Sequence, residues 1–547
     1  MRKQILVLLL CISILLALAA CGPEGKSTTN NDTDKNTASA PGPFGKYDDT
    51  ISFTIGRQGV AGNTLPKGDT LESNDYLKYV ENKLNIKIKY DFSVADADAY
   101  KQKVNLAIAS GNIPDVMIVN EQQFKQLEKA GMLEDLSSAY SKYASPLIKG
   151  YYDSFNGRVL DTVKKTSGGK LDALPDTNIF GQQQLLWLRK DWLDKLNLKV
   201  PKTTDELITV LKAFKTQDPD GNNKNDTLGL LGDPHVFQMG GFFTFDPIFN
   251  AYHAYPDSWI KDSSGSIVNG SIQPEMKQAL AKLQEMYKQG LIDKEFVTKN
   301  FDKDAGLVAD GQAGAVFAPW SGAWMLSDAV KNNKKAEWIP VLAPLDGQNK
   351  YNVMLAAPSG SYLVVKKGYA HPDAVVKALN VEYQGLRLKD PKAADIYKDL
   401  GVSWLNWPLN LQLNNENDVP DSAKIYDKAI QTGDTSDLTP SQKQTFQSIK
   451  NNIKSPKSSM ADYGNWLAYY VGAKKLSSSK LNRIEPAFTG TTKTMDSRGS
   501  NLTKLENETF LKIITGQASV DSFDSFVKEW KKIGGDTITK EVNTAVK

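Results

Sequence analysis

The segment DPDGNNKNDTLG, residues 218–229, places oxygen-bearing side chains at the spacing that a bound cation uses. Positions 1, 3, 5 and 9 of this segment are Asp218, Asp220, Asn222 and Asp226, and position 7 is Lys224, which offers its backbone carbonyl. Ca²⁺ takes about six to eight oxygen ligands, and this order is typical of calcium loops. The sequence therefore predicts a structural Ca²⁺ in this loop.

Two positions of the loop depart from the EF-hand pattern. Asn223 stands where that pattern has Gly, and Gly229 stands where it has Glu. A further ligand must come from another part of the chain or from water. The alternative is a solvated turn rich in Asn and Asp. In either case the loop supports the structure and performs no chemistry.

The N-terminus, MRKQILVLLLCISILLALAACG, has the pattern of a secretory signal. Arg2 and Lys3 are followed by an apolar run and then by small residues before Cys21, which is typical of a bacterial lipobox. We expect residues 1–20 to be a signal peptide and Cys21 to carry the lipid. An uncleaved membrane anchor, or an ordinary signal with an incidental Cys, is the alternative.

The residues after Cys21 are polar and small, so residues 21–45 are predicted to be a flexible tether. About 500 residues remain, which is too many for one hydrophobic core. The net charge is +3, from 66 basic and 63 acidic residues, and gives no support for nucleic-acid binding. No second apolar segment is long enough to span a bilayer.

The motifs of the common enzyme classes are missing from the sequence. The 3 His are scattered, and there is no H-E-x-x-H, G-x-S-x-G or Walker A pattern. Cys11 would be lost with the signal, so the mature chain has no thiol nucleophile. We therefore expect no enzymatic activity. A pair of carboxylates for glycoside hydrolysis stays open, because the 63 acidic residues offer many pairs.

Strands alternate with helices along the chain, which favours α/β layers. We expect an early strand over FTI with Arg57 and Gln58 directly after it, and apolar strands over residues 116–119, 185–189 and 315–318. Thr203 and Glu206 have the spacing of a capping box at the start of a helix.

Several blocks together resemble one family. They are the lipobox, GNIPDVMIVN with LEKAGMLEDL, LWLRKDWLDKLNLKVPKTTDEL, DPDGNNKNDTLG, DGQAGAVFAPWSGAW and VDSFDSFVKEWKKIGGDTITKEVN. The chain resembles the family 1 extracellular solute-binding lipoproteins of bacterial ABC importers. The LplA-like and alginate-oligosaccharide-binding members are more similar than maltose-binding protein.

The resemblance implies a periplasmic-binding-protein-like fold, with two α/β lobes joined by hinge segments and a ligand cleft between them. We place the discontinuous N-lobe at residues 46–180 and 345–400, and the C-lobe at 181–344 and 401–547. The resemblance also implies that the loop at 218–226 holds structural Ca²⁺, as similar loops do in relatives.

Sugar binding requires flat aromatic surface for the C–H faces and polar side chains around the edges. Trp320 follows the strand over residues 315–318, and ligands of open α/β sheets lie at such strand ends. The similar strand-Pro-Trp turn of maltose-binding protein supplies a stacking Trp. A core position is the alternative.

Other candidate sugar contacts follow strands or lie near the expected lobe crossings. They are Trp324, Asn120, Glu121, Gln122, Arg57, Gln58, Trp187, Arg189, Trp404 and Trp407. Asn120 to Gln122 could equally form a solvated loop. Arg189 could pair with an acidic sugar or, as the sequence favours, with a neighbouring Asp.

The sequence thus predicts a solute-binding lipoprotein that captures an oligosaccharide and delivers it to an ABC transporter permease pair. The expected location is the extracytoplasmic face of the cell membrane, on a Gram-positive cell surface, where a monomer is anchored through Cys21. The alternatives are a glycan-binding sensor or adhesin lipoprotein, and a lipoprotein glycoside hydrolase.

Overall fold

The computed structural model of the protein describes residues 41–59, 69–177, 184–387, 396 and 407–546. The signal peptide predicted at 1–20, Cys21, most of the tether and Trp404 lie outside these residues. None of the described helices combines the length and the apolar character needed to cross a membrane.

One sheet has five strands in the order β2-β1-β3-β12-β4. The strands are β1 (Ile51–Gln58), β2 (Ile86–Val94), β3 (Val116–Asn120), β4 (Leu174–Pro175) and β12 (Ser361–Val365). Strand β1 pairs in parallel with β2 and β3, whereas β12 is antiparallel to both β3 and β4. The expected continuous apolar strand at 116–119 is confirmed as the buried part of β3.

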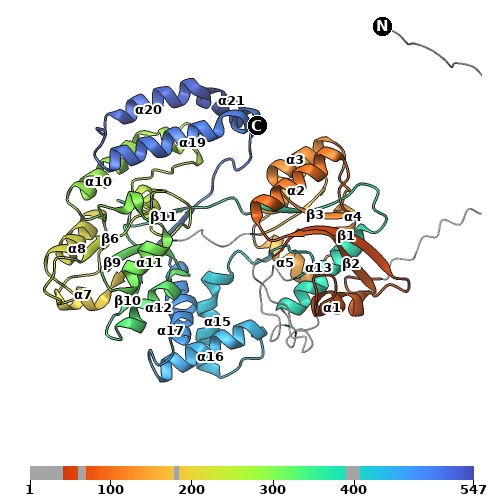
Figure 1. The fold of residues 1–547 in the computed structure, drawn as a ribbon, viewed down its shortest axis with the longest axis horizontal. Helices are drawn as coiled ribbons and strands as arrows, with labels where there is room; N and C mark the ends of the chain where they lie inside the picture. The colour runs from red at the N-terminus through yellow and green to blue at the C-terminus, as the bar shows by residue number, and fades with distance from the viewer. Residues whose placement is uncertain (1–40, 60–68, 178–183, 388–395, 397–406, 547) are drawn as a thin grey trace, which may run out of the picture. The chain divides into compact units, whose positions relative to one another are not determined.

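Helices cover this sheet on both faces (Figure 1). They are α1 (Asp75–Leu84), α2 (Ala97–Ser110), α3 (Glu121–Lys129), α4 (Ser137–Tyr143), α5 (Pro146–Asp153), α6 (Arg158–Thr166) and α13 (Pro372–Arg387). Together they enclose one hydrophobic core. Residues 407–413 add Trp407, Leu409, Leu411 and Leu413 to this core, although we expected the C-lobe from residue 401 onward.

A second sheet has four strands in the order β10-β5-β9-β6. The strands are β5 (Gln184–Arg189), β6 (Leu228–Leu230), β9 (Ala313–Pro319) and β10 (Trp338–Val341). Strand β5 is antiparallel to β9 and β10, and β6 is parallel to β9. Every residue of β5 and β9 is buried, because helices and loops cover both faces.

The helices between and after these strands divide into two groups. The first group is α7 (Lys190–Lys195), α8 (Thr204–Thr216), α9 (Asp246–Ala251), η1 (Gly270–Ile272), α10 (Pro274–Lys288), η2 (Phe296–Thr298), α11 (Phe301–Ala309) and α12 (Gly322–Asn332). The second group is α15 (Asp418–Thr432), α16 (Pro440–Lys454), α17 (Met460–Asn465), η4 (Trp466–Gly472), α18 (Ala473–Leu476), α19 (Lys493–Ile514), α20 (Ser522–Trp530), η5 (Lys531–Gly535) and α21 (Asp536–Ala545). Helices α10, α19, α20 and α21 pack together (Figure 1).

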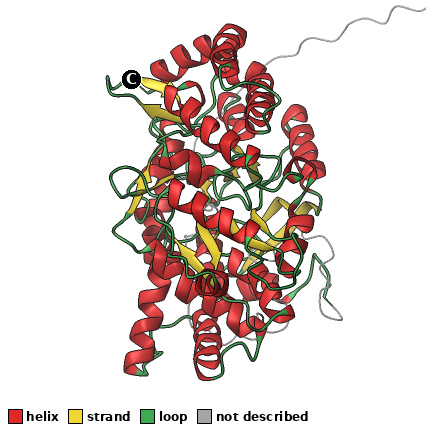
Figure 2. Cartoon of the chain, turned by 90° about the vertical axis from the view of Figure 1, so that its left-hand side faces the viewer, coloured by secondary structure: helices red, strands yellow, loops and turns green. Residues whose placement is uncertain are grey.

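Two small sheets complete the fold, and helices lie around the strands throughout (Figure 2). Strands β7 (Trp259–Lys261) and β8 (Ile267–Asn269) form a hairpin. Strand β11 (Tyr351–Met354) pairs in parallel with β13 (Leu481–Ile484), far along the chain. The mixed α/β architecture confirms the predicted fold class, while the lobe boundaries stay a prediction.

Candidate functional site

Three aromatic side chains meet at the carboxyl end of β9. Trp320 follows β9 directly, Trp324 lies in the first turn of α12, and Tyr469 belongs to the π-helical segment η4. The Trp320 ring centre lies 5.5 Å from that of Trp324 and 4.9 Å from that of Tyr469, and the Trp324 and Tyr469 centres are 5.7 Å apart. We call these three residues the aromatic cluster.

The two tryptophans of the cluster differ in exposure. Trp324 is 39% exposed, whereas Trp320 is only 4% exposed and belongs to a hydrophobic core. The open aromatic surface therefore belongs mainly to Trp324, with Trp320 behind it. Trp320 lies at the strand end expected from the sequence. Its burial, however, matches the alternative of a core position.

Helix α17 and the segment that follows it position the cluster. The Trp324 Nε1 donates a hydrogen bond of 3.0 Å to Asn465 Oδ1. A Cβ on Gly464 would lie 2.8 Å from Trp324 Cδ1, so the absence of a side chain there admits the indole. Tyr469 was missed by the sequence reasoning, because a π-helical turn shifts the residues on a helix face and has no simple sequence signal.

The polar candidates of the five-stranded sheet lie at the end of β3. Asn120 caps α3: its Oδ1 accepts from the Gln123 backbone N–H at 2.9 Å, and Gln123 Oε1 accepts from the Asn120 N–H at 3.1 Å. Glu121 forms an ion pair of 2.7 Å with Lys125, and Gln122 is exposed. The Asn120 side chain thus caps α3, while Gln122 is open to solvent.

Arg57 and Gln58 complete strand β1 rather than follow it, which differs from the expected boundary. Arg57 is 4% exposed, and its Nη1 donates to the Trp407 backbone oxygen at 3.0 Å. The Gln58 backbone oxygen accepts from Asn410 Nδ2 at 2.8 Å. Both residues therefore connect β1 to the segment that begins at Trp407.

Trp187, Arg189 and Trp407 are buried in this structure. Trp187 is fully buried, and its Nε1 donates to the backbone oxygens of Ala318 and Pro319 at 3.2 and 3.3 Å. Trp407 is 1% exposed. These side chains offer no open surface to a ligand here, so their observed contacts are structural.

Arg189 forms the pair with a neighbouring Asp that the sequence favoured. Its Nε and Nη2 donate to the two carboxylate oxygens of Asp191 at 2.9 and 2.7 Å. The guanidinium carbon lies 4.4 Å from the ring centre of Trp192 and 5.9 Å from that of Trp338.

The loop at 218–226 gathers three carboxylates around one amide. Asn222 Nδ2 donates to Asp220 Oδ2 at 2.8 Å and to Asp226 Oδ1 at 3.0 Å, and the Asn222 backbone N–H donates to Asp218 Oδ1 at 3.1 Å. A hydrogen bond with Asp220 lowers the pKa of Asp218, whereas burial and then Asp218 raise the pKa of Asp220.

No group of three or more His, Cys, Asp or Glu side chains is arranged to hold a metal ion within the described ranges. The amide nitrogen of Asn222, rather than its oxygen, faces the carboxylates of the loop. The donor set suits a hard cation, since Asp218, Asp220 and Asp226 are all oxygen donors, but binding requires Asn222 to turn.

Burial raises the pKa values of several carboxyl groups, and it brings four of them to between about 6 and 8. Burial raises the pKa of Asp172 to about 6, of Asp304 to about 7, and of Glu382 and Glu506 to about 8. They lie on different elements, namely the segment before β4, α11, α13 and α19.

Curated relatives match most of the chain. Lipoprotein LipO of Bacillus subtilis is 22% identical over 81% of this chain and 84% of that protein. The polygalacturonan/rhamnogalacturonan-binding protein YtcQ of Bacillus subtilis is 25% identical over 82% of this chain and 84% of that protein. The fructooligosaccharide ABC transporter substrate-binding protein FusA of Streptococcus pneumoniae is 27% identical over 61% of this chain and 60% of that protein.

Solved structures share the fold. An extracellular solute-binding protein from Bifidobacterium longum subsp. infantis has a TM-score of 0.62 at 19% identity, covering 92% of this chain and 98% of that chain. A FusA EF-hand mutant of S. pneumoniae, in complex with fructo-nystose, has a TM-score of 0.58 at 17% identity, covering 90% and 98%.

The family model of the bacterial extracellular solute-binding proteins matches residues 67–381, more than half of the chain. This range includes β3, β5, β9 and most of the aromatic cluster. The protein belongs to the bacterial extracellular solute-binding family.

Proposed function

We propose that the protein captures an oligosaccharide outside the cell and delivers it to an ABC importer. The family assignment carries this proposal. The names of two relatives, a polygalacturonan/rhamnogalacturonan-binding protein and a fructooligosaccharide ABC transporter substrate-binding protein, supply the ligand class. The aromatic cluster supplies chemistry suited to that class, since indole faces pack against the C–H faces of sugars.

The proposed sugar contacts follow from exposure. Trp324 and Tyr469 would stack on the sugar, and Trp320 would hold both rings in place from behind. Glu121 and Gln122, at the start of α3, would serve sugar hydroxyls from the other sheet. Closure of the lobes by hinge motion would bring the two sets together around the ligand.

The buried candidates would support this site from within the two sheets. Trp187 fixes the end of β9 through its bonds to Ala318 and Pro319, directly before Trp320. Arg57 holds β1 against the segment at Trp407. We therefore propose a positioning role for these residues rather than contact with the sugar.

Attachment to the membrane through Cys21 is also part of the proposal. The basic start, the apolar run and the small residues before Cys21 support it. A relative that carries the name lipoprotein supports it further. A thioether-linked diacylglycerol together with an N-acyl chain supplies more than one lipid tail, which gives stable anchoring.

Calcium is proposed as a structural ion of the loop at 218–226. The solved neighbour described as an EF-hand mutant indicates that a related protein has an EF-hand. In this chain Asp218, Asp220 and Asp226 would hold the ion with Asn222 and the Lys224 carbonyl. The ion would neutralise the like charges of Asp218 and Asp220, which lie close enough to share a hydrogen bond.

A calorimetric titration of the purified protein tests the function. Fragments of polygalacturonan, rhamnogalacturonan and fructan are titrated in turn, and the sugar is then recovered and sized. We expect one class to bind, to raise the melting temperature, and to be recovered intact. Binding of none of these sugars contradicts the proposed ligand class, and recovery of shortened sugar indicates a hydrolase.

Variants of the aromatic cluster test the site. Trp324→Ala should weaken binding by roughly 1–3 kcal/mol, the scale of a lost aromatic stack. Trp320→Phe keeps a ring at the buried position and should cost less. Phe44→Ala removes an exposed ring, 42% accessible, outside the cluster and serves as the control. Unchanged affinity in Trp324→Ala would show that the ligand binds elsewhere.

A further inference from the structure

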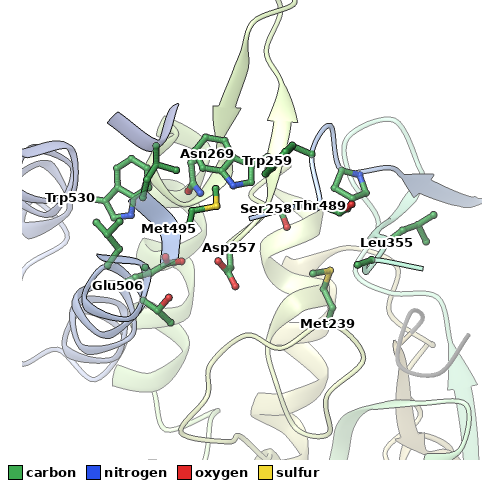
Figure 3. Close-up of a pocket in the computed structure, with 18 residues that line it drawn as sticks. Met239, Asp257, Ser258, Trp259, Asn269, Leu355, Thr489, Met495, Glu506 and Trp530 are labelled. Carbon is green, nitrogen blue, oxygen red and sulfur yellow. The ribbon is translucent and has the colours of Figure 1, made fainter. Parts of the chain in front are cut away.

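A separate cavity of ≈ 330 Å³ lies between the β7–β8 hairpin, the segment that follows β13, and helix α19 (Figure 3). Its walls include Asp257, Glu506, Trp259, Trp530, Phe488 and Met495. Volumes of about 300–1,000 Å³ are usual for small-molecule sites. Two carboxylates and an apolar wall thus face one ligand-sized space.

The Ser271 hydroxyl connects the Glu506 carboxyl group to the backbone of Asp257. Ser271 Oγ donates to Glu506 Oε1 at 2.6 Å and accepts from the Asp257 backbone N–H at 2.7 Å. Asp257 has a φ of 50°, in the left-handed region that few non-glycine residues adopt.

The acidic pair has no cationic partner within the described part of the chain. Lys277 of α10, the helix that packs against α19, forms ion pairs of 3.1 and 2.8 Å with Asp521 and Asp524. A buried carboxylate without a counter-charge is unfavourable. Glu506 is 3% exposed, so this penalty acts on it most strongly.

The protonation of the pair reflects this penalty. Burial, followed by the nearby Asp257 carboxylate, raises the pKa of Glu506 to about 8. Burial also raises the pKa of Asp257, although its side chain still contacts water at the cavity surface. At neutral pH Glu506 is therefore mainly protonated.

The remaining lining combines aromatic and sulfur-containing side chains with polar ones such as Asn269 and Thr503. Trp259 and Trp530 line the cavity with 8% and 3% of their surface exposed. Aromatic faces attract cations through their quadrupole, and quaternary ammonium ions are bound in such surroundings. A hard metal ion would instead require several more oxygen donors than this wall offers.

We propose that this pocket binds a small organic ammonium cation, with its nitrogen beside the Asp257 and Glu506 carboxylates and its carbon atoms against the apolar walls. The pocket is built from the core around α10 and α19, whereas the aromatic cluster belongs to the core around β9. The aromatic cluster is therefore no part of this pocket, although a Cβ on Gly490 of its lining would lie 3.6 Å from Glu121 Oε1.

Choline and its neutral carbon isostere 3,3-dimethylbutanol provide a matched pair of probes for the full-length protein. By calorimetry at pH 8 we expect choline to bind at least tenfold more tightly than the isostere and to raise the melting temperature. Equal affinities, or no binding of choline, would overturn the proposal.

Variants of the acidic pair complete the test. Asp257→Asn should weaken choline binding at least tenfold, whereas Glu508→Gln, an exposed acid on the same helix as Glu506, should leave it unchanged. Choline affinity that survives in Asp257→Asn contradicts the proposal. If Asp257→Asn does not fold, a comparison of Glu506→Gln with Glu508→Gln decides in the same way.

Proton release gives a second readout that a merely structural pair would not produce. A bound cation favours ionised Glu506, so choline binding near pH 7.5 should release a proton, detected as a dependence of the binding heat on the buffer. Asp257 is the charged group that acts on Glu506, since Lys277 on α10 and Glu541 on α21 have other partners. Glu506→Gln should abolish the release, and its persistence there would contradict this role.

Discussion

Arg189 illustrates how a residue suited to binding an acidic ligand is used for internal structure. Its guanidinium makes two hydrogen bonds to Asp191 and lies over Trp192, while only 2% of the residue is exposed. The planar group matches the carboxylate and the ring at once, which an ammonium group cannot do. Arg189 thereby holds the end of β5 against α7.

Replacing Arg189 by Lys should lower the free energy of unfolding by about 2 kcal/mol, because the two-pronged pairing and the stacking are lost. Urea unfolding measures this change. Lys190→Ala, which breaks an exposed i,i+4 pair with Asp194, should have no measurable effect. Equal stabilities of the wild type and Arg189→Lys would show that the pairing contributes nothing net.

Glu382 on α13 gives the fold a dependence on pH. Burial raises its pKa from 4.5 to about 8, opposed by the Leu409 backbone N–H and by Arg57. The unfolded chain loses this proton near the ordinary value, while the folded chain keeps it until about pH 8. Stability from this group is therefore full below pH 4.5 and declines as the pH rises to about 8.

Glu382→Gln should remove this decline, because the amide cannot ionise and its oxygen can still accept from Leu409. Between pH 5 and pH 8.5 the variant should lose at least about 1 kcal/mol less stability than the wild type, the value of one pKa unit. Urea unfolding at both pH values checks this, with the exposed Glu295→Gln as control. Parallel losses in wild type and Glu382→Gln would contradict the assignment.

The role of a single residue could be predicted only where its neighbours in the sequence determine it. The place of Trp320 at a strand end follows from the apolar run before it, and the pairing of Arg189 with an Asp follows from Asp191 two positions later. The burial of Trp407 depends instead on Tyr76 and Tyr79 of α1, more than 300 positions away. No local pattern carries that information.

At the scale of elements, apolar runs predicted the positions of strands well, whereas one capping bond was predicted wrongly. The strand expected at 185–189 is β5, and the one expected at 315–318 is β9 with small extensions. Thr203 caps α8 as expected, but Glu206 Oε2 accepts from the Lys202 N–H and not from Thr203, so the reciprocal half of the capping box is absent from α8. The sequence does not reveal which of two neighbouring backbone N–H groups the Glu206 side chain accepts a hydrogen bond from.

The contact of β9 with α7 and α8 depends on Gly314. A Cβ there would collide with Phe214 and would lie 2.7 Å from Trp192 Cζ3. Gly314→Ala should therefore destabilise the protein by about 1–3 kcal/mol, as overpacking of a core does. Gly306→Ala, in α11 with open space around the added carbon, should be neutral or stabilising by up to about 1 kcal/mol. Similar melting temperatures of the two variants would contradict this packing argument.

For the whole molecule, the order of family-like blocks predicted the fold class, because that order reflects the complete chain rather than one site. The return of residues 407–413 to the first core was not predicted. The return of a late segment to an early core depends on the path of the chain in space. Amino-acid composition does not reveal where along the chain this happens.

Calcium in the loop at 218–226 should stabilise the whole protein. At free calcium 100 times its dissociation constant, the free energy of unfolding should rise by about 2.7 kcal/mol. Thermal unfolding with calcium and with chelator measures this, and Asp226→Asn should reduce the difference. Asp310→Asn, outside the loop, is the control. Identical melting curves with calcium and with chelator would rule out the ion.

Strand β12 delays the completion of the five-stranded sheet while the chain is being synthesised. It lies between β3 and β4, so the five-stranded sheet cannot close until residue 365 has been synthesised. The bond from Tyr47 to Asp373 spans 326 positions, and such distant contacts slow folding. A nascent chain that must wait for its own later residues stays unfolded longer, and an extended chain is the form that can be threaded through a narrow export channel.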